Sequence, residues 1–320
     1  SDLLSFLGGG AEPFSTSDTA SSQLSFALND PRTQMVDVNV DGRVDVMFMN
    51  DTDTFVVVRN FEGGGWMPDF GTSVVEDGMR LGDPGVQLAD LQGDRLPDLV
   101  RMMPTENRVL MAEAIGFGQF LAPVDMGGVP PMTMTDRWEI HDINGDGSGD
   151  LVRIGESGLD VYVNKLDGSF GTAKGMSWDD LGVDETVIFS DVNGNGTLDV
   201  LRVDAVGGTW RYWDIMGRQP GLLDHYENGL GYSIDFEYSS AAAMAWEDQQ
   251  AGEAWTGWSP NAMPVVARTV EQDGWDWEST KTHRFRDGYY DRFRGEFRGF
   301  AQNTATREVD EWTEVSTTVT

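Results

Sequence analysis

Apolar positions in the first two thirds of the chain fall in short runs that polar turns interrupt. Runs such as DVMFM from Asp45 and DVYVN from Asp160 hold Val, Met, Phe and Tyr at the close spacing of half-buried or buried strands. Glycine is abundant, at 39 residues, and follows no collagen-like period, which fits many turns between short strands. The pattern predicts an all-β protein.

The strand pattern also repeats. Similar segments begin at Asp37, Asp90, Asp142 and Asp191, at spacings of 53, 52 and 49 residues. Each continues as a strand, a polar turn and a second strand, as in DLVRIGESGLDVYVNK. A period of about 50 residues built from short strands predicts β-propeller blades, each a small antiparallel sheet. A solenoid is less favoured, because solenoid repeats are usually shorter.

The two ends of the chain differ from the central repeats. SDLLSFLGGG resembles GDLVRIGESG, with Asp2 in the place of Asp150, so we expect the chain to begin inside a further, incomplete blade. The period stops near residue 215, which predicts blades over 1–215 and an antiparallel β-rich region over 216–320. Within that region, 241–262 is a mixed loop or short helix. The stretch after it predicts strand, acidic turn, strand, Gly-Tyr turn and strand, with Pro264 tolerated only as a strand's first residue.

Each repeat opens on an acidic loop with oxygen-bearing side chains at positions 1, 3, 5 and 9. Hard cations such as Ca²⁺ take six to eight oxygen ligands, and alternate residues on a tight loop can supply several of them. The sequence therefore predicts calcium loops. The candidate ligands are Asp37, Asn39, Asp41 and Asp45 in the first loop, Asp90, Gln92, Asp94 and Asp98 in the second, Asp142, Asn144, Asp146 and Asp150 in the third, and Asp191, Asn193, Asn195 and Asp199 in the fourth.

The four acidic loops are not equivalent as calcium sites. The first and third have the fuller pattern, the second has Arg95 in place of glycine at position 6, and the fourth carries one charge fewer. An EF-hand needs Glu at position 12, where these loops have Phe48, Arg101, Arg153 and Arg202 inside a strand, so EF-hands are excluded. The alternative that Asp, Asn and Gly simply form turns stays open.

The chain's charge and composition narrow the function further. With 54 acidic and 22 basic residues, the net charge of −32 argues against binding to nucleic acid or to anionic membranes. There are no cysteines, and no apolar run reaches the length of about 18 residues that a membrane-spanning helix needs. The three histidines are scattered and no hydrolase or nucleotide-binding motif occurs, so we expect no catalysis in this chain. A glycosidase-type carboxylate pair stays open.

The repeats over residues 2 to about 213 resemble FG-GAP/VCBS repeats, the calcium-loop blades also found in integrin-type propellers. The tail is more specific. GLLDHYENGLGYSIDFEYSS, MPVVARTVEQDG and HRFRDGYYDRFRGEFRGF resemble the B component of bacterial ABC (Tc) insecticidal toxin complexes and the N-terminal region of SpvB-like toxins. In that family a propeller precedes the start of an Rhs/YD-type β-shell, and the order here is the same.

This resemblance implies a structural part of a secreted toxin complex. In the family, the B component and a C component form a hollow β-shell around a toxic enzyme, and the propeller closes one end and docks onto a pore-forming A component. The resemblance implies those two protein partners, no membrane insertion by this chain, and catalytic activity that belongs to other segments. The alternative is an extracellular calcium-dependent adhesion or ligand-binding propeller. A carbohydrate-active enzyme is a third hypothesis for the function of the chain.

Overall fold

The computed structural model describes residues 27–61, 65–73, 78–257, 262–291, 296–309 and 312–319. The predicted incomplete blade at residues 1–10 lies outside them. Within these ranges the chain forms antiparallel sheets and a single α-helix, which confirms the all-β prediction. No helix among the described residues combines the length and apolar character that would let it cross a membrane.

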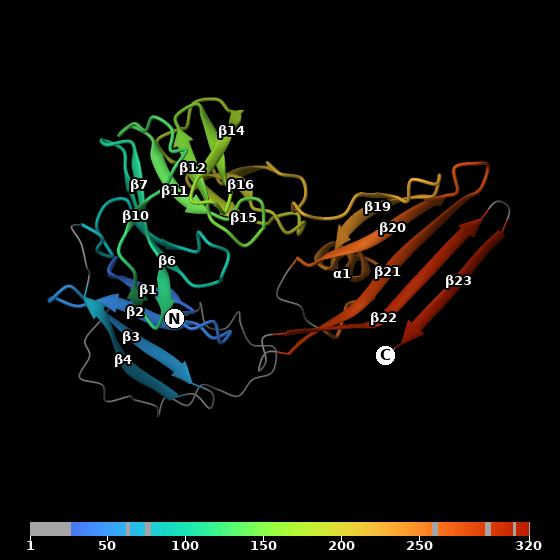
Figure 1. Cartoon of the computed structure of the whole chain (residues 1–320), viewed down its shortest axis with the longest axis horizontal. Helices are drawn as coiled ribbons and strands as arrows, with labels where there is room; N and C mark the ends of the chain where they lie inside the picture. Colours follow the sequence, from blue (N-terminus) through green and yellow to red (C-terminus); the bar gives the residue numbers. More distant parts are fainter. Residues whose placement is uncertain are drawn as a thin grey trace.

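Four small sheets follow one another along the chain, and each contains one predicted repeat (Figure 1). In every repeat the first strand precedes the acidic loop, and the next two form the predicted hairpin. The blades consist of β1 (Thr33–Val36), β2 (Asp45–Met49), β3 (Thr54–Phe61) and β4 (Gly65–Ser73); β5 (Val86–Ala89), β6 (Asp98–Met103), β7 (Arg108–Ala112) and β10 (Val124–Asp125); β11 (Arg137–His141), β12 (Asp150–Gly155), β13 (Gly158–Asn164) and β14 (Phe170–Ser177); and β15 (Glu185–Ser190), β16 (Asp199–Asp204) and β17 (Thr209–Trp213). A separate two-stranded ribbon, β8 (Ala114–Gly116) with β9 (Gln119–Phe120), lies between β7 and β10 in the chain and contacts the first blade.

Among the described residues, three apolar cores lie between consecutive blades, and a smaller cluster lies within the first blade. Side chains alternate between the two faces of a strand, so adjacent residues face different neighbours. In β6, Leu99 joins the cluster shared with the first blade, whereas Val100 joins the cluster shared with the third. In β12, Leu151 and Val152 divide in the same way between the second and fourth blades. This explains the nearly continuous apolar runs of the second and third repeats, whose sheets are buried on both faces.

A wide sheet of six strands follows the blades (Figure 1). Its order is the order of the chain: β18 (His225–Glu227), β19 (Ser233–Ser240), β20 (Pro264–Gln272), β21 (Glu278–Asp291), β22 (Glu296–Val309) and β23 (Trp312–Val319). Pro264 is the first residue of β20, as predicted. The predicted Gly-Tyr turn is wrong, because residues 288–290 lie inside β21. A register shift between Tyr289 and Tyr290 and the left-handed φ of 53° at Asp287 absorb the irregularity there.

The single described helix, α1 (Ala241–Gln250), lies within the mixed region between β19 and β20. Ser240 caps it by accepting a hydrogen bond from the Ala243 backbone N–H, a favoured arrangement that satisfies one free donor of the first turn. Its inner face meets β21 through Met244 and Asp248, both about 5% exposed. Asp248 accepts hydrogen bonds from Arg284 and from the indole of Trp255, so the buried carboxylate is paired.

Candidate functional site

The four acidic loops share one backbone conformation. In the third loop the position-1 carboxylate of Asp142 accepts hydrogen bonds from the backbone N–H groups of Gly145, at 2.7 Å, and Gly147, at 2.9 Å. The position-1 residue of every other loop also accepts from the N–H at position 6. Positions 4 and 6 have left-handed φ in all four loops, even where they are Val40, at 58°, and Arg95, at 72°. The sequence departure at Arg95 therefore does not change the turn.

The position-9 aspartates are the most deeply buried residues of the loops. All four have 0% exposure, and each accepts a hydrogen bond from the backbone N–H at position 2 of its own loop. In the first three blades the second oxygen accepts from a backbone N–H at or just beyond the end of the hairpin's second strand, at 2.8 Å in each case. Position 9 thus latches the loop to the far end of the hairpin, a role that the motif alone did not reveal.

Burial shifts the pKa values of these position-9 aspartates. The pKa of Asp98 is raised to about 6 and that of Asp150 to about 7. Burial is the largest cause, the neighbouring loop carboxylates add to it, and the accepted backbone N–H groups oppose it. Burial also raises the pKa of Asp45 and Asp199. The acidic side chains of each loop are clustered as the sequence predicts, and burial disfavours the charged form of the aspartate at position 9.

The oxygens needed for calcium are present, but some of the carboxylate oxygens accept hydrogen bonds from neighbouring side-chain amides of the same loop. The side-chain amide of Asn144 donates to Asp146 at 2.9 Å, and Asn39 donates to Asp41 at 3.1 Å. Among the residues that the structure describes, no three acidic or histidine side chains converge to hold a metal ion as they stand. Calcium would have to replace these amide contacts, so calcium binding stays a prediction.

Backbone hydrogen bonds link the loops of neighbouring blades. The N–H of Gly149 in the third loop donates to the carbonyl of Asp90 in the second, at 2.6 Å. The N–H of Leu198 in the fourth loop donates to the carbonyl of Ile143 in the third, at 3.0 Å. These contacts join the second, third and fourth blades on the face that carries the loops.

The fourth loop continues this series to the six-stranded sheet. The side-chain amide of Gln219, on the segment that leads to β18, donates to the carbonyl of Gly196 at 2.9 Å. On the other side of the loop, a Cβ at Gly194 would lie 3.0 Å from the Cβ of Ala242, in the first turn of α1. We call this contact region, residues 194–196 with Gln219 and the start of α1, the joint. Sequence reasoning missed it, because nothing in the repeat pattern marks Gln219.

In the second, third and fourth repeats, the arginine at loop position 12 contacts the segment that precedes its blade, whereas the first repeat has Phe48 at that position. Arg153 pairs with Asp160 on the next strand, at 2.5 Å, and with Asp136, at 3.3 Å. Arg202, only 7% exposed, donates to the backbone carbonyls of Asp179 and Asp180 at 2.6 and 2.8 Å and pairs with Glu185. The guanidinium of Arg101 lies against Gly78, where a Cβ would be 2.1 Å from its Nη1.

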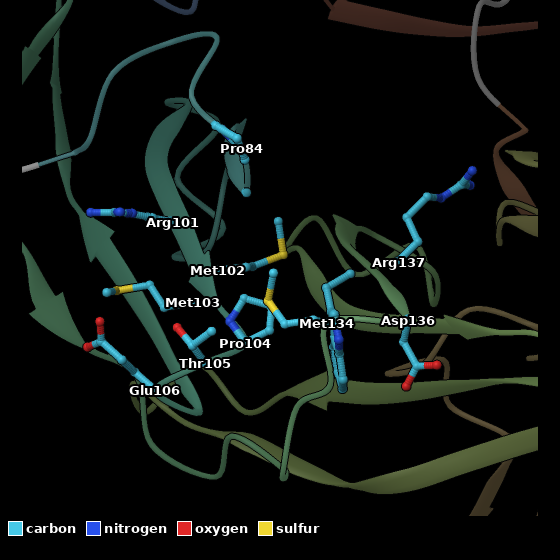
Figure 2. Close-up of a pocket in the computed structure, with 12 residues that line it drawn as sticks. Pro84, Arg101, Met102, Met103, Pro104, Thr105, Glu106, Met134, Asp136 and Arg137 are labelled. Carbon is cyan, nitrogen blue, oxygen red and sulfur yellow. The ribbon is translucent and has the colours of Figure 1, made fainter.

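A groove of about 400 Å³ opens between the second and third blades (Figure 2). Figure 2 shows its two walls. One consists of Met102 to Glu106, from the end of β6 and the β6–β7 turn, and the other contains Met134, Asp136 and Arg137, from the segment before β11 and the first residue of β11. Met102 is buried, whereas Met134 is 72% exposed. A second groove, of about 390 Å³, occupies the equivalent place between the first and second blades, so the repeat generates this feature.

The histidines do not form a catalytic group. His141 ends β11, as a strand-end residue, and pairs with Glu139 at 2.8 Å. His225 pairs with Asp235 at 2.7 Å across β18 and β19, and His283 stacks on Phe285 in β21. The three lie in separate places of the fold, each with an ordinary structural neighbour.

The fold and the joint define a class of protein: propeller-type blades that continue through a packed connection into a wide antiparallel sheet. Residues 168–320 match the family described as the insecticide toxin TcdB middle/N-terminal region. The match begins inside the third blade and covers the whole six-stranded sheet. The predicted resemblance to the B component of Tc toxins is confirmed for this region.

Solved structures support the same fold. A chain of the Photorhabdus luminescens Tc holotoxin pore superimposes with a TM-score of 0.75 at 21% identity, covering 88% of this chain and 14% of its own length. The TcdB2-TccC3 crystal structure superimposes with a TM-score of 0.61 at 17% identity, covering 89% and 19%. This chain therefore spans less than a fifth of those chains. A comparison with curated proteins finds no match.

Proposed function

We propose that this chain is a non-catalytic structural part of a secreted toxin complex. Its blades, residues 1–215, close one end of a cargo-enclosing β-shell, and residues 216–320 begin the shell wall. The observation that carries the proposal is the joint, because both Gln219, on the segment that leads to the sheet, and the first turn of α1 contact the fourth acidic loop. Such a connection holds a cap in a fixed place on a wall, which a flexible linker would not do.

Two features of the six-stranded sheet fit the wall of a larger shell: the length of its strands and its exposed edge strand. Strands β21 and β22 have 14 residues each, which corresponds to roughly 45 Å at the usual rise of an antiparallel strand. The last strand, β23, pairs with β22 along one edge and is exposed from Thr313 to Val319. An exposed edge strand is a template for a further strand. We propose that the shell wall continues there.

The proposed partners follow from the structures that share the fold. The solved relatives contain TcdB2 together with TccC3, and a Tc holotoxin pore. We propose that this chain likewise contributes to an assembly with a shell-completing C component and a pore-forming A component. The net charge of −32 favours a partner with a cationic surface. The groove face of the blades, with Met134 exposed at its rim, is the proposed docking face for the A component.

We also propose that Ca²⁺ binds the first and third acidic loops and stabilises the blades. The third loop offers Asp142 and Asp146 with the side-chain oxygen of Asn144, and the first loop offers the matching set. The cation would offset the repulsion between carboxylates that lie close together. It would have no part in chemistry.

Assembly with purified components tests the structural role. The full chain is mixed with a Tc-type A component and, separately, with a C component, and complexes are detected by light scattering after gel filtration. Met134→Glu in the groove should weaken binding to the A component by about tenfold or more, since it places a charge at the centre of a contact. Trp246→Glu, an exposed residue of α1, is the matched control and should leave that binding unchanged. Absence of any complex with either component would refute the proposal.

A further inference from the structure

Two turns of the six-stranded sheet share one conformation. Residues 228–232 join β18 to β19, and residues 273–277 join β20 to β21. In each turn the Oδ1 of the first residue, Asn228 or Asp273, accepts hydrogen bonds from the backbone N–H groups of the third and fifth residues, at 2.8 to 3.3 Å. The N–H of the first residue donates to the carbonyl of the fifth, and the second residue is a glycine with left-handed φ, at 72° and 79°. Both turns are therefore held in place by their own hydrogen bonds.

The two turns also contact each other. Strand β19 pairs with β18 on one side and with β20 on the other, so both turns lie at the same end of the sheet. A Cβ at Gly274 would lie 2.5 Å from the carbonyl oxygen of Gly231, so the two backbones touch where only glycine fits. We call the two turns together the tip. Because β19 continues at its other end into α1, the tip lies at the end of the sheet away from α1 and from the joint (Figure 1).

The third residue of each turn is a large apolar side chain that faces the solvent. Leu230 and Trp275 are both 87% exposed. The hydrogen bond that each of them donates inside its turn comes from the backbone, so the turns do not need apolar side chains at these positions. Tryptophan is one of the residue types that dominate the binding energy of protein interfaces. A tryptophan on a preorganised turn also loses little conformational entropy when a partner binds it.

Acidic residues surround the two apolar side chains. Residues 226–232 and 271–278 contain five acidic residues and no basic one. They are Glu227, Asp276 and Glu278, which are exposed, and Glu271 and Asp273, which are half-buried. Lys281, further along β21, already pairs with Glu271, at 3.8 Å. The tip is therefore an apolar centre inside a negatively charged rim.

We propose that the tip is a docking site for a protein partner whose surface presents arginine or lysine around an apolar contact. Leu230 and Trp275 supply the apolar centre, and the carboxylates of the rim pair with the partner's cations. An arginine can stack on the indole of Trp275 while it pairs with Asp276, the next residue. The same charge argues against a second copy of this chain, which carries −32, and against an anionic membrane. This surface is separate from the groove between the blades and from the edge of β23.

Binding of a defined cationic peptide to the full chain tests this site. The probe is a short fluorescent peptide of alternating arginine and leucine, and its affinity is measured by anisotropy. Trp275→Ser and Leu230→Ser should each weaken binding by about tenfold or more, since each removes part of the apolar centre. Val206→Ser is the matched control and should bind as the native chain does. Val206 is 79% exposed on the β16–β17 turn, where Asp204 likewise accepts its backbone N–H.

Further variants separate the apolar centre from the charged rim and from loss of folding. Trp275→Phe keeps an apolar ring and should retain most of the binding, and circular dichroism checks the fold of each variant. Asp276→Asn should weaken binding and reduce its dependence on salt, whereas Asp184→Asn, at an exposed position of the fourth blade, should change neither.

Two comparison peptides and two other ligands complete the test. Peptides of alternating arginine and serine, or of glutamate and leucine, should bind more weakly than the arginine-leucine probe, because each lacks one half of the complementary surface. Equal affinity of the native chain and Trp275→Ser for the probe, or equal binding of the arginine-serine peptide, would overturn the proposal. So would binding at Trp275 of phosphatidylserine vesicles or of an N-acetylglucosamine oligomer in place of the probe. None of these results depends on assembly with toxin components.

Discussion

Two glycines of the third acidic loop allow the packing between loops to be measured separately from backbone strain. Gly145 and Gly147 both have left-handed φ, at 75° and 93°. A Cβ at Gly145 would lie 2.0 Å from the carbonyl oxygen of Gly196 in the fourth loop and 2.8 Å from Nε2 of Gln219. A Cβ at Gly147 would meet no atom within 4 Å. The substitutions Gly145→Ala and Gly147→Ala therefore differ in what the methyl group meets.

The expected magnitudes follow from these contacts. The left-handed conformation costs an alanine about 1–2 kcal/mol, and both variants lose that amount. Gly145→Ala must also move a backbone carbonyl, and forcing an extra methyl into packed structure costs typically about 1–3 kcal/mol more. We expect Gly145→Ala to be the less stable of the two by about 2 kcal/mol, with the damage centred on the joint.

Urea denaturation gives the free energy of unfolding of both variants and of the native chain, and hydrogen exchange locates the change. In Gly145→Ala, the amides of Gly196 and Leu198 should exchange faster, while in Gly147→Ala they should keep their native protection. Equal destabilisation of the two variants, or native protection of the fourth loop in Gly145→Ala, would refute the close packing between the third loop and the joint. The main support for blades held in a fixed place on the shell wall would then be lost.

The remaining predictions address the arginine ties, pH and calcium. Arg202→Met should destabilise the chain by about 2 kcal/mol through the loss of two charge-assisted hydrogen bonds to backbone carbonyls, whereas the exposed Arg218→Met should cost less than about 0.5 kcal/mol; equal urea midpoints would contradict this. The raised pKa values of Asp98 and Asp150 mean that the folded chain binds more protons than the unfolded chain between about pH 4 and 7. Their contribution to stability therefore falls as pH rises through this window, and a free energy of unfolding in chelator that instead rises from pH 5 to 7.5 would count against it. Chelation should lower the melting temperature of the native chain, by an amount that grows with the calcium it had bound, and a melt that excess chelator leaves unchanged would exclude structural calcium.

The fold could be predicted in large part because its determinants are local and repeated. Two short apolar runs joined by a polar turn predict a hairpin, and four copies at one spacing predict blades. The error at Gly288 and Tyr289 has a physical cause: glycine next to aromatics is common in turns, but here the partner strand has Gly299 opposite Tyr289, and a bulge keeps the pair together. The turn-forming residues are visible in the sequence, whereas the strand with which they pair is not.

The site was predictable only as far as the motif extends. Positions 1, 3, 5 and 9 are visible in the sequence, yet the same aspartate at position 9 has two different environments. In three blades a residue at or just beyond the end of the hairpin gives it a backbone donor, whereas in the fourth blade Asp214, just beyond β17, accepts hydrogen bonds from the side-chain amides of the loop. The difference arises because the fourth blade is the last, so the chain leaves it toward the sheet instead of returning to another blade. The loop that fits the motif least well is therefore the loop that contacts the segment leading to the sheet, through the side-chain amide of Gln219.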